Sequence, residues 1–142
     1  MTRGYTLVEF VVTLAIIGIV TAVTLPRWGG VLDRIAVERA ASEVTTALAV
    51  ARNAAVLRAT RARLVIASDS LRVDEWGDGA WVAVWRWPGP EWHAVSLVIS
   101  NPTVIFDPTG IGFGASNTTV ELQRGTKTSK ITTSRIGRVK RW

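Results

Sequence analysis

Basic side chains gather at the C-terminal end of this sequence. Residues 110–142 hold seven Lys and Arg residues and a single carboxylate, Glu121, whereas residues 1–109 hold ten basic and ten acidic residues. The formal net charge of +6 therefore arises entirely in the last quarter of the chain. The seven basic residues are Arg124, Lys127, Lys130, Arg135, Arg138, Lys140 and Arg141. Such an asymmetry favours a polyanionic partner: nucleic acid, anionic lipid head groups or an acidic protein face.

DNA fits this cluster because binding to regularly spaced phosphates requires several reachable cations and no fixed motif. Trp142 follows the cluster directly and offers an aromatic ring on which an exposed base can stack. These seven basic residues and Trp142 are the candidate DNA-binding residues. Two other interpretations stay open. The charges can protect a solvated sheet edge from aggregation, or they can dock onto an acidic face of a neighbouring subunit.

Catalysis and metal binding have little support in the sequence. His93 is the single histidine, cysteine is absent, and no Ser/His/Asp grouping is evident. The carboxylates of Asp74, Glu75 and Asp78 lack the spacing of an EF-hand loop, and a solvated turn explains them better. We therefore expect no enzymatic activity, no cofactor and no metal site.

The start of the chain is apolar and contains one isolated carboxylate. From Phe10 to Leu25 there is no charged residue and no proline. Counted from Tyr5, about 21 residues at about 1.5 Å per helical residue are enough to cross a bilayer. Glu9 lies near the start of this run, and an ionisable group at membrane depth is a functional candidate by default because it costs a few kcal/mol.

The leader and the glutamate together carry a recognisable pattern. A short basic leader, residues 1–4, directly precedes the apolar run, and Glu9 follows Gly4 by five positions. This pattern resembles the class III signal of type IV prepilins and type II secretion pseudopilins. The resemblance implies that a prepilin peptidase cleaves between Gly4 and Tyr5 and methylates the new N-terminus at Tyr5. Tyr5 departs mildly from this pattern, in which Phe is usual. The same resemblance implies a helix bend at Pro26.

The resemblance also implies a role for Glu9 in assembly. In such filaments the equivalent glutamate is thought to meet the N-terminal amine of a neighbouring subunit, and a buried charge becomes tolerable when it gains an opposite partner. The alternative is that Glu9 simply extends toward the membrane interface. The partners implied are other pilins or pseudopilins, contacted through the N-terminal helix, and the prepilin peptidase in the inner membrane.

The later sequence narrows the resemblance to one family. An Ala- and Arg-rich helix end at 51–56, the turn at 106–110 and the closing segment at 134–139 resemble the GspH/FimT family of minor pilins and pseudopilins. GspH-type members lie near the tip of the type II secretion pseudopilus, and some FimT-type members of type IV pili bind DNA through a basic C-terminal segment. Two functions follow: a structural subunit that initiates or caps a filament for protein secretion, or a subunit that captures DNA for uptake in natural transformation.

The resemblance also implies a location and a domain plan. The chain is expected in the bacterial inner membrane as a single-pass protein, with its globular domain in the periplasm or outside, before it assembles into a filament. Residues 1–4 are the leader, 5–28 the transmembrane and filament-core helix, and 29–62 an amphipathic continuation of that helix. Residues 63–142 are a β-rich globular domain that ends in the basic segment.

The hydrophobic pattern predicts an α+β fold in which one long N-terminal helix, its first half membrane-spanning, packs on a C-terminal antiparallel β-sheet domain, and the resemblance implies that this fold is type IV pilin-like. An apolar stripe recurs at alternating spacings of three and four, as expected for one helix face. The stripe consists of Val37, Ala41, Val44, Leu48, Ala51 and Ala55. On the other face, Arg34 is spaced to pair with Glu38, and Arg39 with Glu43. Four arginines, at 52, 58, 61 and 63, gather where cations favour the helix dipole.

After Arg63 the hydrophobic period changes to two, which predicts strands. Expected strands include 64–66, 71–73, 81–87, 93–100 and 104–106, then a hairpin of 119–122 with 130–133 and a last strand at 138–142. Strict alternation in 81–87 would put Trp81, Trp85 and Trp87 on one face. We expect most of the seven tryptophans to pack in the core or between sheets, with Trp85 and Trp87 as an alternative partner surface.

Overall fold

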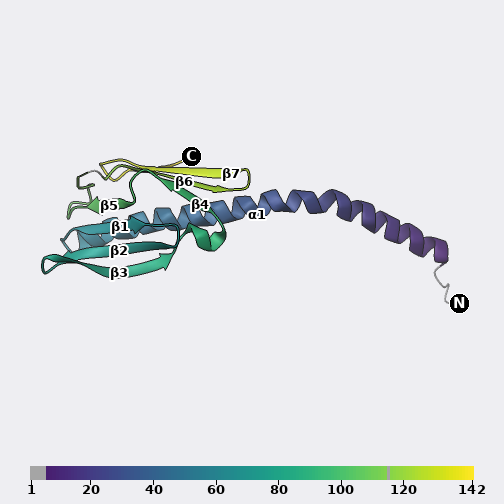
Figure 1. Cartoon of the computed structure of the whole chain (residues 1–142), viewed down its shortest axis with the longest axis horizontal. Helices are drawn as coiled ribbons and strands as arrows, with labels where there is room; N and C mark the ends of the chain where they lie inside the picture. The colour runs from purple at the N-terminus through teal and green to yellow at the C-terminus, as the bar shows by residue number, and fades with distance from the viewer. Residues whose placement is uncertain (1–5, 115) are drawn as a thin grey trace. The chain divides into compact units, whose positions relative to one another are not determined.

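The computed structural model describes residues 6–114 and 116–142, and for residues 24–28 it describes the backbone without the side chains. Within this part of the chain, one long helix, α1 (Leu7–Leu57), precedes antiparallel strands (Figure 1). The strands are β1 (Ala62–Ile66), β2 (Ser70–Gly77), β3 (Ala80–Pro88), β4 (Ser96–Ile99), β5 (Thr103–Phe106), β6 (Thr118–Arg124), β7 (Lys127–Thr133) and β8 (Val139–Arg141). A short 3-10 helix, η1 (Pro90–His93), lies between β3 and β4.

Residues 1–32 and 33–142 form two compact units. In the first unit the large apolar side chains that the structure describes are exposed, for example Phe10 at 62% and Ile19 at 67%. Among the described residues, no helix has the length and apolar character needed to cross a membrane. The predicted cleavage and methylation residues, Gly4 and Tyr5, lie outside the described residues. Pro26 lies within α1, and the bend there stays a prediction.

The first turn of α1 is closed by two reciprocal hydrogen bonds. The N–H of Glu9 donates to the Thr6 hydroxyl over 3.3 Å, and the N–H of Thr6 donates to the Glu9 carboxylate over 3.4 Å. This arrangement is a capping box, which satisfies donors that the helix itself leaves free. In the single chain the Glu9 carboxylate thus caps the start of its own helix.

The last turn of α1 ends in a Schellman motif. The N–H of Thr60 donates to the Ala55 carbonyl over 3.2 Å, and the N–H of Ala59 donates to the Val56 carbonyl over 3.3 Å. Ala59 itself adopts the left-handed conformation, with φ of 50°. These bonds satisfy carbonyls at the helix end and reverse the chain direction. The helix therefore stops at Leu57, before the end expected near residue 62.

The core of the second unit is built on one stripe of α1. All six stripe residues predicted from the spacing, from Val37 to Ala55, are buried. They pack with apolar residues of both sheets in a single cluster that includes Leu64, Phe106 and Ile131. Because most of the stripe is Ala or Val, the strands can lie close to the helix axis (Figure 1).

The strands form two four-stranded antiparallel sheets. Sheet A has the order β3-β2-β1-β5, and sheet B has the order β4-β6-β7-β8. Core residues of each sheet pack against α1. The edge strands are β3 and β5 in sheet A and β4 and β8 in sheet B. The expected hairpin is present as β6 and β7, and the expected last strand, β8, lies at a sheet edge.

A β-bulge overturns the predicted alternation in β3. The register between β2 and β3 shifts between Val73 and Asp74. Trp81 consequently pairs with Trp76 on the outward face of sheet A, whereas Trp85 and Trp87 pair with the buried Val73 and Leu71. An extra residue on one strand reverses the sides of everything beyond it, and sequence alternation cannot reveal it.

The tryptophans are also less buried than expected. Among the described side chains, no tryptophan belongs to the buried core, and Trp87 is only partly buried against it. Trp76, Trp85, Trp92 and Trp142 are all exposed. Trp92 lies in η1, which also includes His93, the residue at which a strand was expected to begin. The left-handed Ala94, with φ of 53°, ends η1 and delays β4 to Ser96.

The acidic residues predicted to form a solvated turn are instead mostly buried in β2. Asp74 is 2% exposed and Glu75 is 8% exposed. Arg63 Nε lies 2.7 Å from the Asp74 carboxylate and Arg72 Nε 2.9 Å, and Arg58 pairs with Glu75 over 3.5 Å. Two of the four arginines predicted to gather at the helix end, Arg58 and Arg63, therefore pair with strand carboxylates, and the last turn of α1 itself holds no basic residue. In the described part of the chain, no group of three or more acidic or histidine side chains could hold a metal ion.

Candidate functional site

The basic C-terminal segment lies on sheet B and divides into paired and unpaired cations. Three of the predicted residues are ion-paired to carboxylates. Arg124 Nε lies 2.9 Å from Asp33, Lys130 Nζ lies 2.7 Å from Glu121, and Arg141 contacts Glu38. In the residues that the structure describes, Lys127, Arg135, Arg138 and Lys140 have no ion pair with a carboxylate. These last four are the cations that remain available to an external anion.

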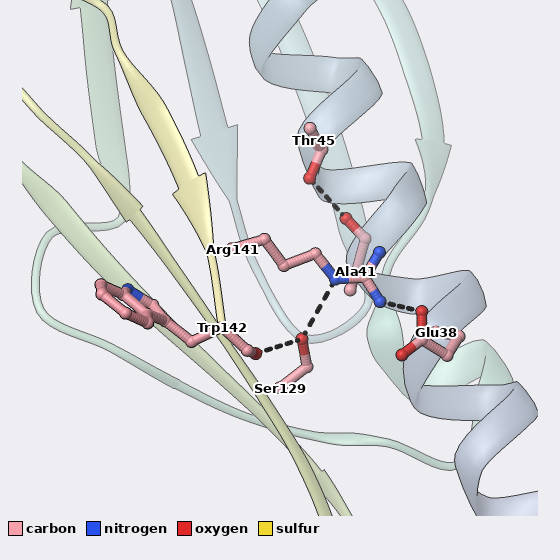
Figure 2. A network of polar contacts seen from close by, with 6 residues as sticks. All are labelled: Glu38, Ala41, Thr45, Ser129, Arg141 and Trp142. Carbon is pink, nitrogen blue, oxygen red and sulfur yellow. Dashed lines mark hydrogen bonds and ion pairs between the residues drawn. The ribbon is translucent and has the colours of Figure 1, made fainter.

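Arg141 fastens the edge strand β8 to α1. Its guanidinium contacts the Glu38 carboxylate, and its Nε donates to the Ser129 hydroxyl over 3.3 Å (Figure 2). The Ser129 hydroxyl in turn donates to the Trp142 carbonyl over 3.5 Å. The Arg141 side chain therefore points toward the helix, away from the outward face of sheet B (Figure 2). It contributes to docking β8 on α1, so we remove it from the set of anion-binding candidates.

Arg124 has a similar structural role at the other end of the hairpin. Besides its ion pair with Asp33, it donates to the His93 carbonyl over 2.6 Å. His93 Nε2 lies 2.9 Å from the Glu43 carboxylate of α1. Gly125, with φ of 56°, permits this approach, because a Cβ there would collide with the Asp33 carboxylate. The single histidine thus has a partner and helps to hold η1 against the helix.

The unpaired cations gather at the end of β7 and the start of β8. Arg138 and Lys140 line one concave surface of about 360 Å³, together with Asn117, Thr132, Thr133 and Ser134. Arg138 also lines a second one, of about 440 Å³, whose other walls include Arg52 and Phe106. Arg135 is exposed in the loop between β7 and β8. This end of sheet B presents hydroxyl, amide and guanidinium donors, the groups that bind phosphate or carboxylate oxygens.

Lys127 is separate from this group. It pairs with Arg124 next to the β6–β7 turn, at the opposite end of β7 from Thr133. Seven residues at about 3.3 Å each put roughly 20 Å between the two ends of β7. The structure therefore brings together Arg138 and Lys140, keeps Arg135 on the adjoining loop, and separates Lys127 from all three.

Trp142 continues the ladder of β8. Its N–H donates to the Lys130 carbonyl over 2.9 Å, and the residue is 67% exposed. Lys140 lies two residues earlier on the same strand face, with Nζ 3.4 Å from the centre of the indole ring. One face of Trp142 is therefore covered by a cation of its own chain, and the remaining surface is open.

The paired residues were beyond the reach of sequence reasoning. Helical spacing predicted Arg34–Glu38 and Arg39–Glu43 pairs, but Glu38 pairs with Arg141 and Glu43 with His93. These contacts join positions far apart in the chain, and no local spacing signals them. Of the acidic partners, Glu38 is exposed on α1, whereas Asp33 is half-buried one turn before Val37 of the buried stripe, and neither position signals the partner.

Two family models match the sequence. The model described as type II transport protein GspH matches residues 40–137, and the prokaryotic N-terminal methylation motif matches residues 1–25. The chain belongs to the GspH family. The predicted GspH/FimT resemblance is thus confirmed, and the methylation motif indicates processing of the prepilin type. No curated protein sequence matches the chain.

Solved structures share its fold. The type IV minor pilin FimU of Pseudomonas aeruginosa strain PAO1 is 16% identical, with a TM-score of 0.63 over 73% of this chain and 86% of that chain. The minor pseudopilin EpsH of the type 2 secretion system of Vibrio cholerae is 13% identical, with a TM-score of 0.60 over 75% and 95%. The predicted α+β pilin-like fold is confirmed. This GspH-family chain is a pilin-like structural subunit of the type IV pilus or type II secretion class, and not an enzyme.

Proposed function

We propose that this chain is a minor filament subunit that helps to initiate or cap a type II secretion pseudopilus or a type IV pilus. The observation that carries the proposal is the apolar surface of residues 7–23, whose large hydrophobic side chains are exposed in the single chain. A surface of this kind has to be covered by lipid or by other proteins. In the proposed cycle, residues 5–28 anchor the subunit in the inner membrane and then pack among the helices of other pilins.

Processing precedes assembly in this proposal. The prepilin peptidase cleaves between Gly4 and Tyr5 and methylates Tyr5, and the new N-terminal amine becomes the partner of Glu9 on a neighbouring subunit. The capping box gives Glu9 a second use, because its carboxylate accepts the N–H of Thr6 in the single chain. Assembly would therefore transfer the carboxylate from a local N–H to a full positive charge, a stronger interaction.

The test separates processing from assembly. The full chain and its Glu9→Leu variant are produced in a bacterium with a prepilin peptidase and a matching set of filament subunits. Mass spectrometry should find an N-terminal methylated Tyr5 in both, whereas only the unaltered chain should appear in sheared filaments. A Thr13→Val variant, one turn further along α1, is the matched control and should assemble. Intact residues 1–4 in the purified protein, or normal assembly of the Glu9 variant, would refute the proposal.

A second function, DNA capture, is favoured by one specific observation. Arg135, Arg138 and Lys140 have no ion pair with a carboxylate within the described chain, and Lys140 contacts the exposed Trp142. Cations already paired inside the protein contribute less to a new partner, so these three should account for most phosphate contacts. If they bind three phosphates of duplex DNA, log K should fall with log salt with a slope of roughly −3.

The DNA test uses residues 29–142, which contain every buried apolar residue of the described core. A variant with Arg135, Arg138 and Lys140 changed to Gln should lose most of its affinity in a salt series. The control changes Arg34, Arg39 and Arg86 to Gln, which removes the same charge from other surfaces and should leave the slope unchanged. Equal losses in both variants would show non-specific attraction by net charge, and no binding at low salt would refute DNA capture by this subunit alone.

A further inference from the structure

Strand β3 is an edge strand whose protection against pairing, a bulge, Arg86 and Pro88, is confined to its C-terminal half. The other three sheet edges are short: β4 and β5 have four residues each, and β8 has three, two of them basic. By contrast, β3 has nine residues, is rich in Val, Trp and Ala, and has its proline only at the end, at Pro88. Val82 is 55% exposed and Trp85 is 41% exposed. A long, apolar and unpaired edge is a template for another strand.

The turn before β3 determines which backbone groups are free. Asp78 and Gly79 form a two-residue connection with φ of 50° and 79°, the geometry of a type I′ hairpin. Gly77 and Ala80 flank it as the closing pair. Because hydrogen bonding alternates along an antiparallel strand, the N–H and C=O groups of Trp81 and Ala83 are directed away from β2. Two donors and two acceptors thus line the open edge before the bulge.

We propose that β3 pairs antiparallel with β3 of a second copy of this chain, with the two-fold axis at Val82. In this register Trp81 lies opposite Ala83 of the second copy, and each pair exchanges two backbone hydrogen bonds. Val82 lies opposite Val82 in a closely spaced, non-hydrogen-bonded pair. The pairing joins the two four-stranded A sheets into one continuous sheet, and the bulge confines regular pairing to residues 80–84.

Charge at the ends of this segment supports the second copy as the occupant. Arg86 is 68% exposed at its side chain and has only a long contact, 3.8 Å, with Asp69. Asp78 has no ion pair within the described residues. Arg86 and Asp78 of the second copy then lie at the same end of the joined edge, just outside the paired residues 80–84, and symmetry repeats this approach of opposite charges at the other end. The edge is thus complementary to itself in both backbone and charge.

The interface is small, so association should be weak and is best captured by cross-linking. Five paired residues bury less than the roughly 1,200 Å² of a stable interface, and a transient contact is expected. The chain contains no cysteine, so a single introduced one reports its own environment. In the full chain, solubilised in a mild detergent, Val82→Cys should form an intermolecular disulfide under gentle oxidation. The control is Val98→Cys on the edge strand β4, where Val98 is 67% exposed. Any association through the N-terminal helices would bring the copies together equally in both variants.

Two further changes test the register. Ala83→Pro in the Val82→Cys background removes an outward N–H, which edge strands tolerate, and should reduce cross-linking at least tenfold. Arg86→Glu in the same background puts a carboxylate at the same end of the joined edge as Asp78 of the second copy and should slow cross-linking at low salt. The effect should shrink in 1 M salt, where the Debye length falls to about 3 Å and the repulsion is screened. Circular dichroism and tryptophan fluorescence report whether each variant keeps the fold.

The outcomes are distinct. Rapid cross-linking at position 82, slow cross-linking at 98, and loss in the two variants would support the paired edge. Equal rates at 82 and 98 would overturn it. Rapid cross-linking at 82 that neither variant changes, with the fold intact, would overturn the register and the strand pairing with it. If the proline variant unfolds, the salt dependence of Arg86→Glu alone decides.

Discussion

The Asp74 carboxylate is the most enclosed charge among the described residues of sheet A. It is 2% exposed and lies between Arg63 and Arg72 on the face of the sheet that is turned away from the core. The Arg63 guanidinium stacks over the Trp81 ring at 4.6 Å, and Trp81 contacts Trp76 edge to face at 5.2 Å. The two arginines and the tryptophans together shield the carboxylate from water, and the two ion pairs offset the cost of burying it.

Asp74→Asn should therefore destabilise the domain strongly. The change leaves two arginines around a neutral amide, and removing one partner of a buried ion pair typically costs about 3 kcal/mol or more. Urea unfolding of residues 29–142 measures the free energy directly. Asp78→Asn, a neighbouring exposed carboxylate in a turn that favours Asn, is the control and should change stability by less than about 0.5 kcal/mol. Similar values for both variants would mean that the pairs contribute nothing net.

The carboxylate of Asp107, in the turn after β5, makes the stability of that turn depend on pH. Its carboxylate accepts a hydrogen bond from the Thr109 hydroxyl, 2.6 Å, and from the N–H groups of Ile111 and Thr109. The Thr109 hydroxyl first, then these N–H groups, hold the pKa of Asp107 below its ordinary value of 3.8. Because the folded pKa is lower than the unfolded one, this stabilisation is present above pH 3.8 and disappears as the pH falls through the folded pKa.

Thr109→Val should raise the pKa of Asp107 toward the ordinary value by removing its strongest hydrogen bond. An NMR titration of the side-chain carboxyl carbon in residues 29–142 measures the shift. Thr103→Val, on the preceding strand, is the control and should leave the Asp107 titration unchanged. An unaltered titration in the Thr109 variant would assign the lowered pKa to the backbone N–H groups and to the charge of Arg61.

At the residue scale, the sequence showed which side chains carry charge but not which of them are already neutralised. The seven C-terminal cations looked equivalent, yet three are paired with Asp33, Glu121 and Glu38. Two of those carboxylates lie on α1, about ninety or more positions earlier in the chain. Long-range partners depend on how the sheets dock on the helix, and local spacing has no access to that.

At the element scale, α1 could be predicted from its stripe but not its end. Six apolar residues at spacings of three and four identified the buried face, because residues at these spacings lie on the same side of a helix and that side packs against the core. Its end is set by Ala59 in a conformation that favours glycine, so the sequence carried no stop signal there. No sequence feature indicated the bulge opposite Asp74 either, although the bulge determines which tryptophans of β3 face outward.

Ala59→Gly should stabilise the domain. The left-handed conformation of Ala59 costs a non-glycine residue about 1–2 kcal/mol, and glycine removes this cost. Glycine also has more conformational entropy in the unfolded chain, which lowers the net stabilisation to roughly 0.5–1 kcal/mol. Ala49→Gly makes the same chemical change on the exposed face in the interior of α1 and should destabilise by about 1 kcal/mol. Chemical denaturation of both variants tests the opposite signs. A loss of stability at position 59 would contradict the left-handed ending.

At the scale of the whole molecule, the chain separates two tasks. Residues 7–23 offer apolar surface and one carboxylate, whereas residues 33–142 carry the core, both sheets and the basic segment. The composition of the first segment is enough by itself to predict a filament or membrane partner, because a continuous apolar run needs a cover. The surfaces of the second unit could not be foreseen in the same way, because an open edge such as β3 exists only once the strands have taken their order in the sheet.

Removal of residues 1–28 should leave the stability of the globular domain nearly unchanged. Every buried apolar residue of the described chain lies between Ala36 and Ile131, so the deletion removes no part of the core. The ion pair of Asp33 with Arg124, near the start of the remaining helix, is also kept. Thermal unfolding of the full chain in detergent and of residues 29–142 in the same detergent should give midpoints within a few degrees. Deletion to residue 44 is the contrasting variant, because it removes Val37, Ala41 and Val44 from the core, and it should abolish cooperative unfolding.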